Sequence, residues 1–325
     1  MSITTELILS EKDIQFLKLL AAKITEIPSI EPELYCKQAK GLSEYLPTHI
    51  KETLSYFSEF GSDTGFLLIK NISLDDTEIP ENPNENSFKI GEQTILSKIQ
   101  AILISYIGEM IAYEAEGHGR LFQDIVPIHS MATNQTSLGS RIELENHTEQ
   151  CFSNLRPDVL CLACLRGDEN AFTYIMPVKT VIKHLTDEEI KYLREPNWIT
   201  GVDLSFKMNG NEFIDGDVRG PFPIISGSVE DPHFLFDEDL MNGIDEKSQR
   251  MVGKIIEIYK ANREIHNLKP GEIVLIDNRR AVHGRSAFLP KYNGTDRFLI
   301  RCFATFDYEK SEYAREERTV KAIYS

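Results

Sequence analysis

The sequence predicts an α+β protein in which helices cover a sandwich or jelly roll of short strands. Apolar residues recur at helical spacing over much of residues 11–60. From about residue 125 onward, short apolar stretches are instead separated by Gly, Pro, Asp and Asn, which is typical of strands joined by turns. The chain lacks βαβ alternation, and it has no GxGxxG or P-loop motif. These features argue against a doubly wound nucleotide-binding fold.

Length and composition are those of a globular protein with a sizeable core. The chain has 325 residues, of which 41% are hydrophobic and 26% charged. We expect one elaborated domain over residues 1–325, with a mainly helical part at 1–120 and the strand-rich core at 121–310. An inserted lid and helix are expected around 205–265.

The first part of the chain is expected to contain three helical regions and one strand. Residues 11–24 and 44–60 have apolar residues at helical spacing, the second region around a proline. Residues 65–72 (GFLLIKNI) predict a short buried strand. Residues 73–94 are rich in Pro, Asn and acids and predict a surface loop, and the helical pattern returns at 95–114.

The second part of the chain is expected to be built mainly from buried strands. Its short apolar stretches each have a turn residue, Gly, Asp or Pro, at one or both ends. A single helix is expected among them, in the stretch DEKSQRMVGKIIEIYKANRE. The predicted strands are 158–165, 171–178, 271–278 and 297–306.

The net charge limits the partners of the protein. A formal charge of -16, with no stripe of Lys and Arg, repels polyanions and argues against nucleic acid. It favours cationic or zwitterionic small molecules. The sequence contains no apolar run long enough for a membrane span and no signal peptide, so we expect a cytoplasmic protein without a membrane partner. The sequence is also compatible with a homo-oligomer.

The five cysteines predict reduced thiols. Their odd number and scattered positions do not resemble a disulfide framework. Cys161 and Cys164 form a CxxC, but it lies in the apolar run VLCLACL without a second CxxC. We therefore expect both side chains to pack in a buried strand rather than to bind zinc.

Three residues form a candidate metal site. His147 and Glu149 are two positions apart in ELENHTEQCF, so in an extended strand they project from the same face. His283 follows in IDNRRAVHGRSAF, after a predicted strand. Two histidines and one carboxylate make the facial triad of Fe(II) oxygenases, which leaves coordination positions open for a co-substrate and O₂.

Two arginines after His283 strengthen this interpretation. Arg297 and Arg301 lie 14 and 18 positions further on, within RFLIRCF. In a strand, residues four apart share a face, so both guanidinium groups can point into one cavity. Arginine is suited to bidentate binding of carboxylates. An ion pair with Asp296 or a surface position is the simpler alternative.

The combination of HTE, DNRRAVHGR and YNGTDRFLIR resembles the clavaminate synthase-like branch of the 2-oxoglutarate-dependent oxygenases, especially its free L-lysine and L-arginine hydroxylases. The resemblance covers residues 125–307 and is strongest over 270–303. It implies a double-stranded β-helix (jelly roll) core with flanking N-terminal and inserted helices. It also implies oxidative decarboxylation of 2-oxoglutarate to succinate and CO₂, coupled to hydroxylation of a C–H bond.

The resemblance also implies roles for individual residues. His147, Glu149 and His283 would bind Fe(II), and Arg297 would hold the distal carboxylate of 2-oxoglutarate. The remaining positions that match the family's co-substrate and amino acid contacts are Thr173, Arg301, Gln135 and Ser137. Thr173 is explained as well by an ordinary strand threonine, and turn formation explains the small polar residues of NQTSLGS almost as well.

Asp237 is the candidate contact for the side-chain end of the substrate. Its position matches the carboxylate that the family presents to a substrate cation, although a solvated acidic loop explains it equally. Arginine-hydroxylating relatives carry a second acid where this chain has Leu235. One carboxylate beside an apolar neighbour suits lysine better than a guanidinium. Family membership favours hydroxylation of L-lysine at C4, with arginine or ornithine hydroxylation and lysine 3-hydroxylation as alternatives.

Two other classes of protein fit parts of the pattern. A cupin-like binding module could use a jelly roll without chemistry, but it would not need the triad together with Arg297. A zinc hydrolase could use the same ligands, but it would have no use for a carboxylate clamp. Turnover with Fe(II) and 2-oxoglutarate distinguishes the oxygenase from both.

Overall fold

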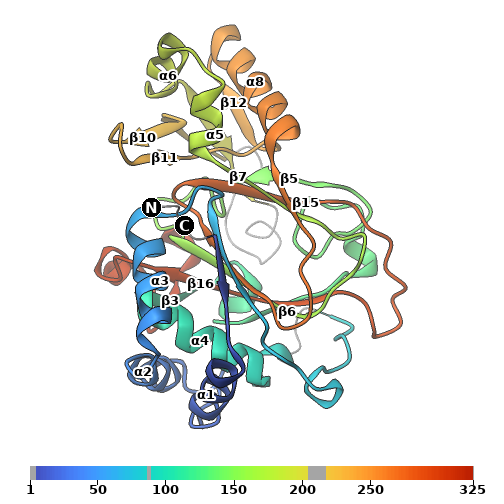
Figure 1. Ribbon diagram of the computed structural model, residues 1–325. Coiled ribbons are helices and arrows are strands. Elements are labelled where there is room, and N and C mark those ends of the chain that lie inside the picture. Colours follow the sequence, from blue (N-terminus) through green and yellow to red (C-terminus); the bar gives the residue numbers. More distant parts are fainter. Residues whose placement is uncertain (1–4, 86–88, 204–216, 325) are drawn as a thin grey trace.

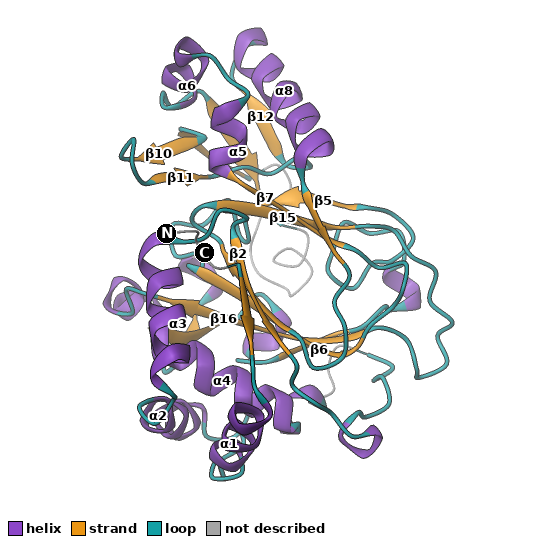
Figure 2. Cartoon of the chain, viewed as in Figure 1, coloured by secondary structure: helices purple, strands orange, loops and turns teal. Residues whose placement is uncertain are grey.

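Two mainly antiparallel sheets face each other in the computed structural model, which describes residues 5–85, 89–203 and 217–324 (Figure 1). The larger sheet has the strand order β1-β2-β14-β6-β16-β3-β18-β17, with β4 also paired to β16. The smaller sheet has the order β13-β7-β15-β5. Helices pack outside the larger sheet, and a second group of helices lies beyond the smaller one (Figure 2). The predicted jelly roll with flanking and inserted helices is confirmed.

The strands of the larger sheet are β1 (Glu6–Ile8), β2 (Phe66–Lys70), β3 (Glu109–Tyr113), β4 (Gln123–Ile125), β6 (Val159–Arg166), β14 (Ile273–Asp277), β16 (Phe298–Thr305), β17 (Arg315–Glu316) and β18 (Thr319–Val320). Those of the smaller sheet are β5 (Leu144–His147), β7 (Thr173–Pro177), β13 (Glu264–His266) and β15 (Ala281–Arg285). Two further small sheets contain β8 (Trp198–Gly201), β9 (Val218–Phe222) and β12 (Met241–Gly243), and β10 (Ile225–Gly227) with β11 (Pro232–Phe234).

The α-helices are α1 (Glu11–Ala21), α2 (Pro32–Ser43), α3 (Thr48–Phe60), α4 (Ile95–Ile107), α5 (Val178–Lys183), α6 (Asp187–Leu193) and α8 (Glu246–Asn262). Short 3₁₀ turns are η1 (Asp76–Glu78), η2 (Gly91–Gln93), η3 (Gly117–Gly119), η4 (His129–Met131), η5 (Glu309–Ala314) and η6 (Ala322–Tyr324). In the part of the chain that the structure describes, none of the helices is long and apolar enough to cross a membrane.

Strand β6 shows why the central strands are apolar throughout. Cys161 and Ala163 face the core formed with α1–α4, whereas Leu160, Leu162 and Cys164 face the space between the sheets. Both faces are covered, so alternation of polar and apolar residues is not required. All five cysteines are free and buried, as expected from their apolar surroundings.

The N-terminal helices are fixed to the larger sheet by capping and by one buried amide. Ser10 caps α1 in a capping box with Asp13, which satisfies backbone N–H groups of the first turn. On α4, the Gln100 amide donates to the carbonyl oxygens of Cys161 and Ile300, at 3.1 and 3.2 Å. This side chain therefore links the helix to both β6 and β16, the two strands at the centre of the sheet.

A second helical layer covers the outer face of the smaller sheet. Met176 of β7 and Val282 of β15 belong to the same apolar cluster as Ile255 of α8. In this cluster the Trp198 indole N–H donates to the carbonyl oxygen of Ser248, at 3.0 Å. The smaller sheet is thus enclosed on its outer face, and its inner face is turned toward the larger sheet.

Two expectations about this architecture need correction. The helix predicted over 95–114 ends at Ile107, because Gly108 is extended and the following residues form β3, paired with β16. A short apolar run is compatible with both a helix and a strand, and here pairing with β16 makes residues 109–113 a strand. Helices α5 and α6 were not expected, since they are too short to show clear periodicity. Residues 204–216 of the predicted lid lie outside the described residues.

Gly271 supports the turn that leads into β14, and its replacement tests this turn. It has φ +80, and a Cβ atom there would lie 1.8 Å from the carbonyl oxygen of Ile72. Gly271→Ala should therefore lower the free energy of unfolding by at least about 2 kcal/mol. Gly253→Ala on α8, where nothing lies within 4 Å, should raise it by about 1 kcal/mol. Denaturant unfolding measures both, and equal effects would contradict the assignment.

Candidate active site

Two histidines of the smaller sheet and a glutamate just beyond the end of β5 meet at one point. Among the described residues, His147, Glu149 and His283 form the only group of three such residues whose ligand atoms all lie within 4.8 Å of one another. The Nε2 atom of His283 is 3.3 Å from Oε2 of Glu149, and Nε2 of His147 is 3.9 Å from the same oxygen. The predicted triad is therefore assembled in space, with its histidine rings 4.4 Å apart.

Strand pairing brings these residues together. In the antiparallel pair of β5 and β15, His283 lies directly opposite His147. Glu149 lies beyond the end of β5, so the expectation that His147 and Glu149 share one strand was wrong. The Asn278 side chain instead holds Glu149 in place. It accepts from the Glu149 backbone N–H at 2.8 Å and donates to the Glu149 carbonyl oxygen at 3.1 Å.

The protonation of the histidines suits metal binding. Nδ1 of His147 lies 2.8 Å from the carbonyl oxygen of Glu145, and donation to this oxygen leaves the Nε2 lone pair free. Burial, together with His147, lowers the pKa of His283 to about 4, so its imidazole is neutral near pH 7. Oε2 of Glu149 is buried without a hydrogen-bond partner. The free Nε2 atom of His147, the neutral imidazole of His283 and this carboxylate oxygen fit a divalent metal ion.

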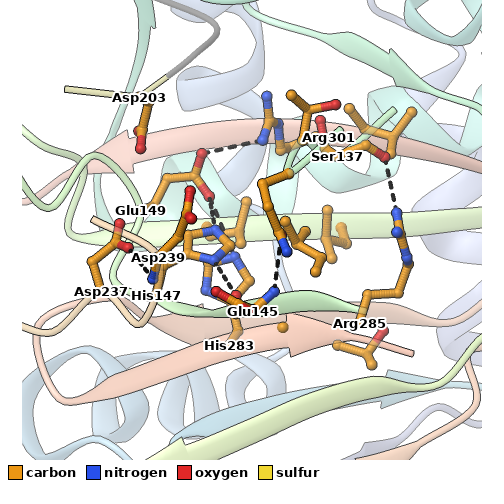
Figure 3. A pocket seen from close by; sticks show the side chains of 18 of the residues that line it. Ser137, Glu145, His147, Glu149, Asp203, Asp237, Asp239, His283, Arg285 and Arg301 are labelled. Carbon is orange, nitrogen blue, oxygen red and sulfur yellow. Dashed lines mark hydrogen bonds and ion pairs between the residues drawn. The ribbon is translucent and has the colours of Figure 1, made fainter. Parts of the chain in front are cut away.

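Arg301 connects the triad to a second carboxylate. Its Nη1 donates to Oε1 of Glu149 at 3.1 Å, and Nη2 donates to Glu116. Its Nε donates to the side-chain oxygen of Gln123 at 3.0 Å. Burial alone would raise the pKa of Glu149, but Arg301 and the two histidines lower it to about 2. One carboxylate oxygen is thus held by Arg301 while the other faces the histidines (Figure 3).

A pocket between the two sheets contains every predicted site residue. The inward-facing residues of β16, β6, β7 and β15 form its walls, as expected for a jelly roll. The predicted residues that line it are His147, Glu149, His283, Arg297, Thr173, Gln135, Ser137, Asp237 and Arg301. Arg297 and Arg301 share one face across the start of β16, as their spacing predicted.

Asp237 lies next to the triad on a segment paired with β5. An isolated antiparallel bridge joins it to His147. Its Oδ1 accepts from the backbone N–H groups of Asp239 and Leu240, at 3.0 and 2.8 Å. Burial raises the pKa of Asp237 to about 6, against the opposite effect of His147. One oxygen of the Asp237 carboxylate thus stabilises the turn at Asp239 and Leu240. These bonds and His147 compensate its negative charge only in part.

Two sequence-based interpretations of single residues change. Leu235 does not line the pocket but packs against the outer apolar cluster of the helical layer. The apolar neighbour of Asp237 in the pocket is instead Leu240. Gln135 lines the pocket, but its amide bonds the loop backbone, donating to the carbonyl oxygen of Glu143 and accepting from the Glu145 N–H.

Five further charged residues line the pocket that were not among the predicted site residues. They are Glu116, Glu145, Asp203, Asp239 and Arg285. Arg285 ends the motif DNRRAVHGR, and Glu145 and Asp239 each lie two positions from a predicted site residue, so the spacing used for His147 and Glu149 could have found these three, whereas Glu116 and Asp203 lie in segments without a local motif. Burial and the nearby Asp237 raise the pKa of Asp203 well above its ordinary value, against the opposite effect of Arg301.

Comparisons with known proteins agree with this site. Residues 63–303 match the family described as taurine catabolism dioxygenase TauD, TfdA family. An L-lysine 3-hydroxylase from Catenulispora acidiphila is 44% identical over 98% of this chain and 89% of its own length. Clavaminate synthase 2 from Streptomyces clavuligerus is 28% identical over 89% of this chain and 88% of its own. An L-lysine 4-hydroxylase from Flavobacterium sp. is 24% identical over 80% of this chain and 71% of its own.

A solved structure shows the same fold over the whole chain. The crystal structure of asparagine oxygenase with Fe(II), 2S,3S-3-hydroxyasparagine and succinate has a TM-score of 0.89 and 26% identity, and the match covers 98% of this chain and 99% of that one. That protein thus holds iron, a hydroxylated amino acid and the product of 2-oxoglutarate together.

Replacement of one ligand tests the metal site. His283→Ala should weaken binding of Fe(II) or Mn(II) by on the order of 100-fold or more, because loss of a supporting residue alone costs 10- to 100-fold. Anaerobic calorimetric titration measures this affinity. His233→Ala is the control, since His233 lies outside the pocket beside Asp231. Unchanged metal affinity in His283→Ala would contradict the assignment.

Proposed function

The chain belongs to the TauD and TfdA family of dioxygenases, and we propose that within this family it hydroxylates free L-lysine at C3. The protein is an Fe(II)- and 2-oxoglutarate-dependent amino acid hydroxylase. The identity of the amino acid, the carbon that is hydroxylated and the roles of individual residues are our proposals. The observation that carries them is one pocket with a metal triad, buried arginines and unpaired acids.

His147, Glu149 and His283 would hold the iron, which supplies the activation of O₂ when it is bound. Arg297 would hold the distal carboxylate of 2-oxoglutarate. In the described part of the chain its guanidinium is within ion-pair distance of none of the carboxylates, although only 6% of the residue is exposed. Thr173 Oγ1 is buried without a partner in the same pocket and can donate to that carboxylate.

Arg301 and Glu116 would bind the two charges of the amino acid headgroup. They form a buried ion pair at the pocket wall beside the triad. A free amino acid carries a carboxylate and an ammonium on one carbon, so its headgroup can replace each partner's contact with the other. A residue within a peptide lacks at least one of these two charges and could not replace the Arg301–Glu116 pair in this way, which favours free amino acids over peptides.

Asp237 and Asp203 would receive the side-chain ammonium of lysine. Both are carboxyl groups whose pKa is raised by burial in the pocket. A cation placed between them would compensate their charge, as burial of an unpaired carboxylate is unfavourable. Leu240 and Leu144 also line the pocket and provide apolar contact for a methylene chain.

The expected position of hydroxylation at C4 is unconfirmed, and two observations favour C3. The lysine 3-hydroxylase relative is 44% identical, against 24% for the 4-hydroxylase relative. Arg301 also donates directly to the triad residue Glu149 at 3.1 Å. A headgroup bound to Arg301 is therefore held close to the metal site, and the carbon next to the α-carbon is nearest to it. The alternative of lysine 3-hydroxylation is thus better supported than the original expectation.

Deuterated substrates test the proposed function. With Fe(II), ascorbate and 2-oxoglutarate, lysine should stimulate succinate formation more than arginine, ornithine or asparagine does. Hydroxylation of 3,3-dideuterolysine should remove one deuterium, whereas 4,4-dideuterolysine should retain both. Mass spectrometry of the product measures this, and NMR locates the added oxygen. Loss of deuterium from C4 would refute the proposed position, and lack of stimulation by lysine would refute the substrate.

Asp237→Asn tests the ammonium contact without disturbing the turn. The Asn side-chain oxygen can still accept from Asp239 and Leu240, whereas alanine would remove these bonds. The variant should weaken lysine binding about 30-fold or more, which corresponds to roughly 2 kcal/mol for a buried charge contact. Decay of 2-oxoglutarate without substrate should change little.

The pH dependence of the same variant provides a second measurement. The Asp237 carboxyl group has a raised pKa of about 6 and is charged above it. The KM for lysine in the parent should therefore rise as the pH falls from about 8 to about 5. This part of the rise should be absent from Asp237→Asn. Identical pH profiles in the two proteins would exclude Asp237 as the ammonium ligand.

A further inference from the structure

Arg285 is a buried cation in the pocket whose role the proposed function leaves open. It ends strand β15, two residues after His283, and only 4% of it is exposed. In the antiparallel pair of β15 and β7 it lies opposite Thr173, and both residues line the pocket with Arg297. Two guanidinium groups and one hydroxyl therefore belong to the same part of the pocket wall.

The contacts of Arg285 leave its charge uncompensated. It donates to three backbone carbonyl oxygens, those of Ser286 at 3.1 Å and of Ser137 and Ile142 at 3.3 Å. Figure 3 shows the bond to Ser137. Carbonyl oxygens satisfy its N–H groups but carry no net charge. Across the described ranges, neither Arg285 nor Arg297 takes part in an ion pair, unlike Arg301.

The two arginines also act on each other. Both side chains are almost fully buried, with only 4% of Arg285 and 6% of Arg297 exposed, so water screens neither charge well. Both remain charged near pH 7. A pair of buried cations without an anion is unfavourable, and an anion bound between them relieves both desolvation and repulsion.

Charge is separated along the pocket. Besides the triad glutamate, its acids are Glu116, Glu145, Asp203, Asp237 and Asp239, while Arg285 and Arg297 are cations that form no ion pair with any acid of the described residues. The Thr173 hydroxyl, buried without a partner, adds a neutral donor beside the cations. This arrangement favours a ligand whose additional negative charge lies at the Arg285 and Arg297 end.

We propose that Arg285 is a specificity-determining residue for the co-substrate, acting with Arg297 to select 2-oxo acids that carry a distal carboxylate. The proposal rests on the assignment of Arg297 as the carboxylate ligand in the proposed function. Arg285 adds the second positive charge that a monocarboxylic 2-oxo acid cannot compensate. Through its bonds to Ser137 and Ile142 it also keeps the loop that forms this side of the pocket in place.

The test compares two 2-oxo acids by binding rather than by turnover. Fe(II)-loaded protein is titrated anaerobically with 2-oxoglutarate and with 2-oxopentanoate, which has the same chain without the distal carboxylate. Arg285→Gln should weaken 2-oxoglutarate binding about tenfold or more but change 2-oxopentanoate binding less than about twofold. Arg285→Lys, which keeps the charge, should retain most of the preference.

A matched control removes an exposed arginine from the same loop. Arg141→Gln changes the net charge by the same amount and should leave both affinities unchanged, since Arg141 is exposed. If Arg285→Gln weakens both 2-oxo acids equally, or leaves 2-oxoglutarate binding intact, the proposal is refuted. Loss of the preference for 2-oxoglutarate in Arg285→Lys would also refute the proposal. This second variant keeps the test decisive if Arg285→Gln does not fold.

Arg297→Gln distinguishes failure of this inference from failure of the proposed function. If Arg297→Gln loses the preference for 2-oxoglutarate while Arg285→Gln keeps it, the role of Arg285 is refuted and the proposed function stands. If neither variant changes the preference, the assignment of this end of the pocket to the co-substrate is itself refuted.

Discussion

The register of β5 against β15 is the constraint on which the site depends. It places His283 opposite His147, and a further bridge aligns Asp237 with His147. A shift of β5 by one residue would turn His147 to the opposite face of the sheet, away from His283, because side chains alternate along a strand. The outer face of the smaller sheet is buried beneath α5 and α8. A slipped register would place polar residues of the inner face in this apolar layer, which is unfavourable.

The second feature of the pocket is the placement of charge between two apolar layers. Arg301 is paired with two acids, whereas Arg285 and Arg297 have neutral surroundings in the described residues. Asp237 and Asp203 have raised pKa values, while Glu149 has a lowered one because Arg301 contacts it. Burial amplifies each of these differences, since charges in a pocket are screened less than at the surface. The same charge distribution underlies both the proposed substrate and the proposed co-substrate contacts.

Much of the fold and site followed from local patterns in the sequence. Strands 158–165 and 297–306 were predictable because apolar residues bounded by turn residues are typical of buried strands. Gly108 is the point where prediction failed, since the residues after it suit both helix and strand until β16 is known as their partner. Leu235 was misassigned for a similar reason. Which side of its strand segment faces the pocket depends on pairing with distant residues.

The sequence by itself determined the candidate metal ligands and the two arginines 14 and 18 positions after His283, because residue type and spacing within a strand limit which side chains can converge. It also determined the family, through motifs concentrated over 270–303. Only the tertiary structure decided that Glu149 lies beyond its strand, that Glu116 pairs with Arg301, and that Arg285 joins Arg297 without an acidic partner. These contacts are between residues far apart in the chain, so sequence spacing does not reveal them. Burial between two sheets strengthens the electrostatic interactions among them.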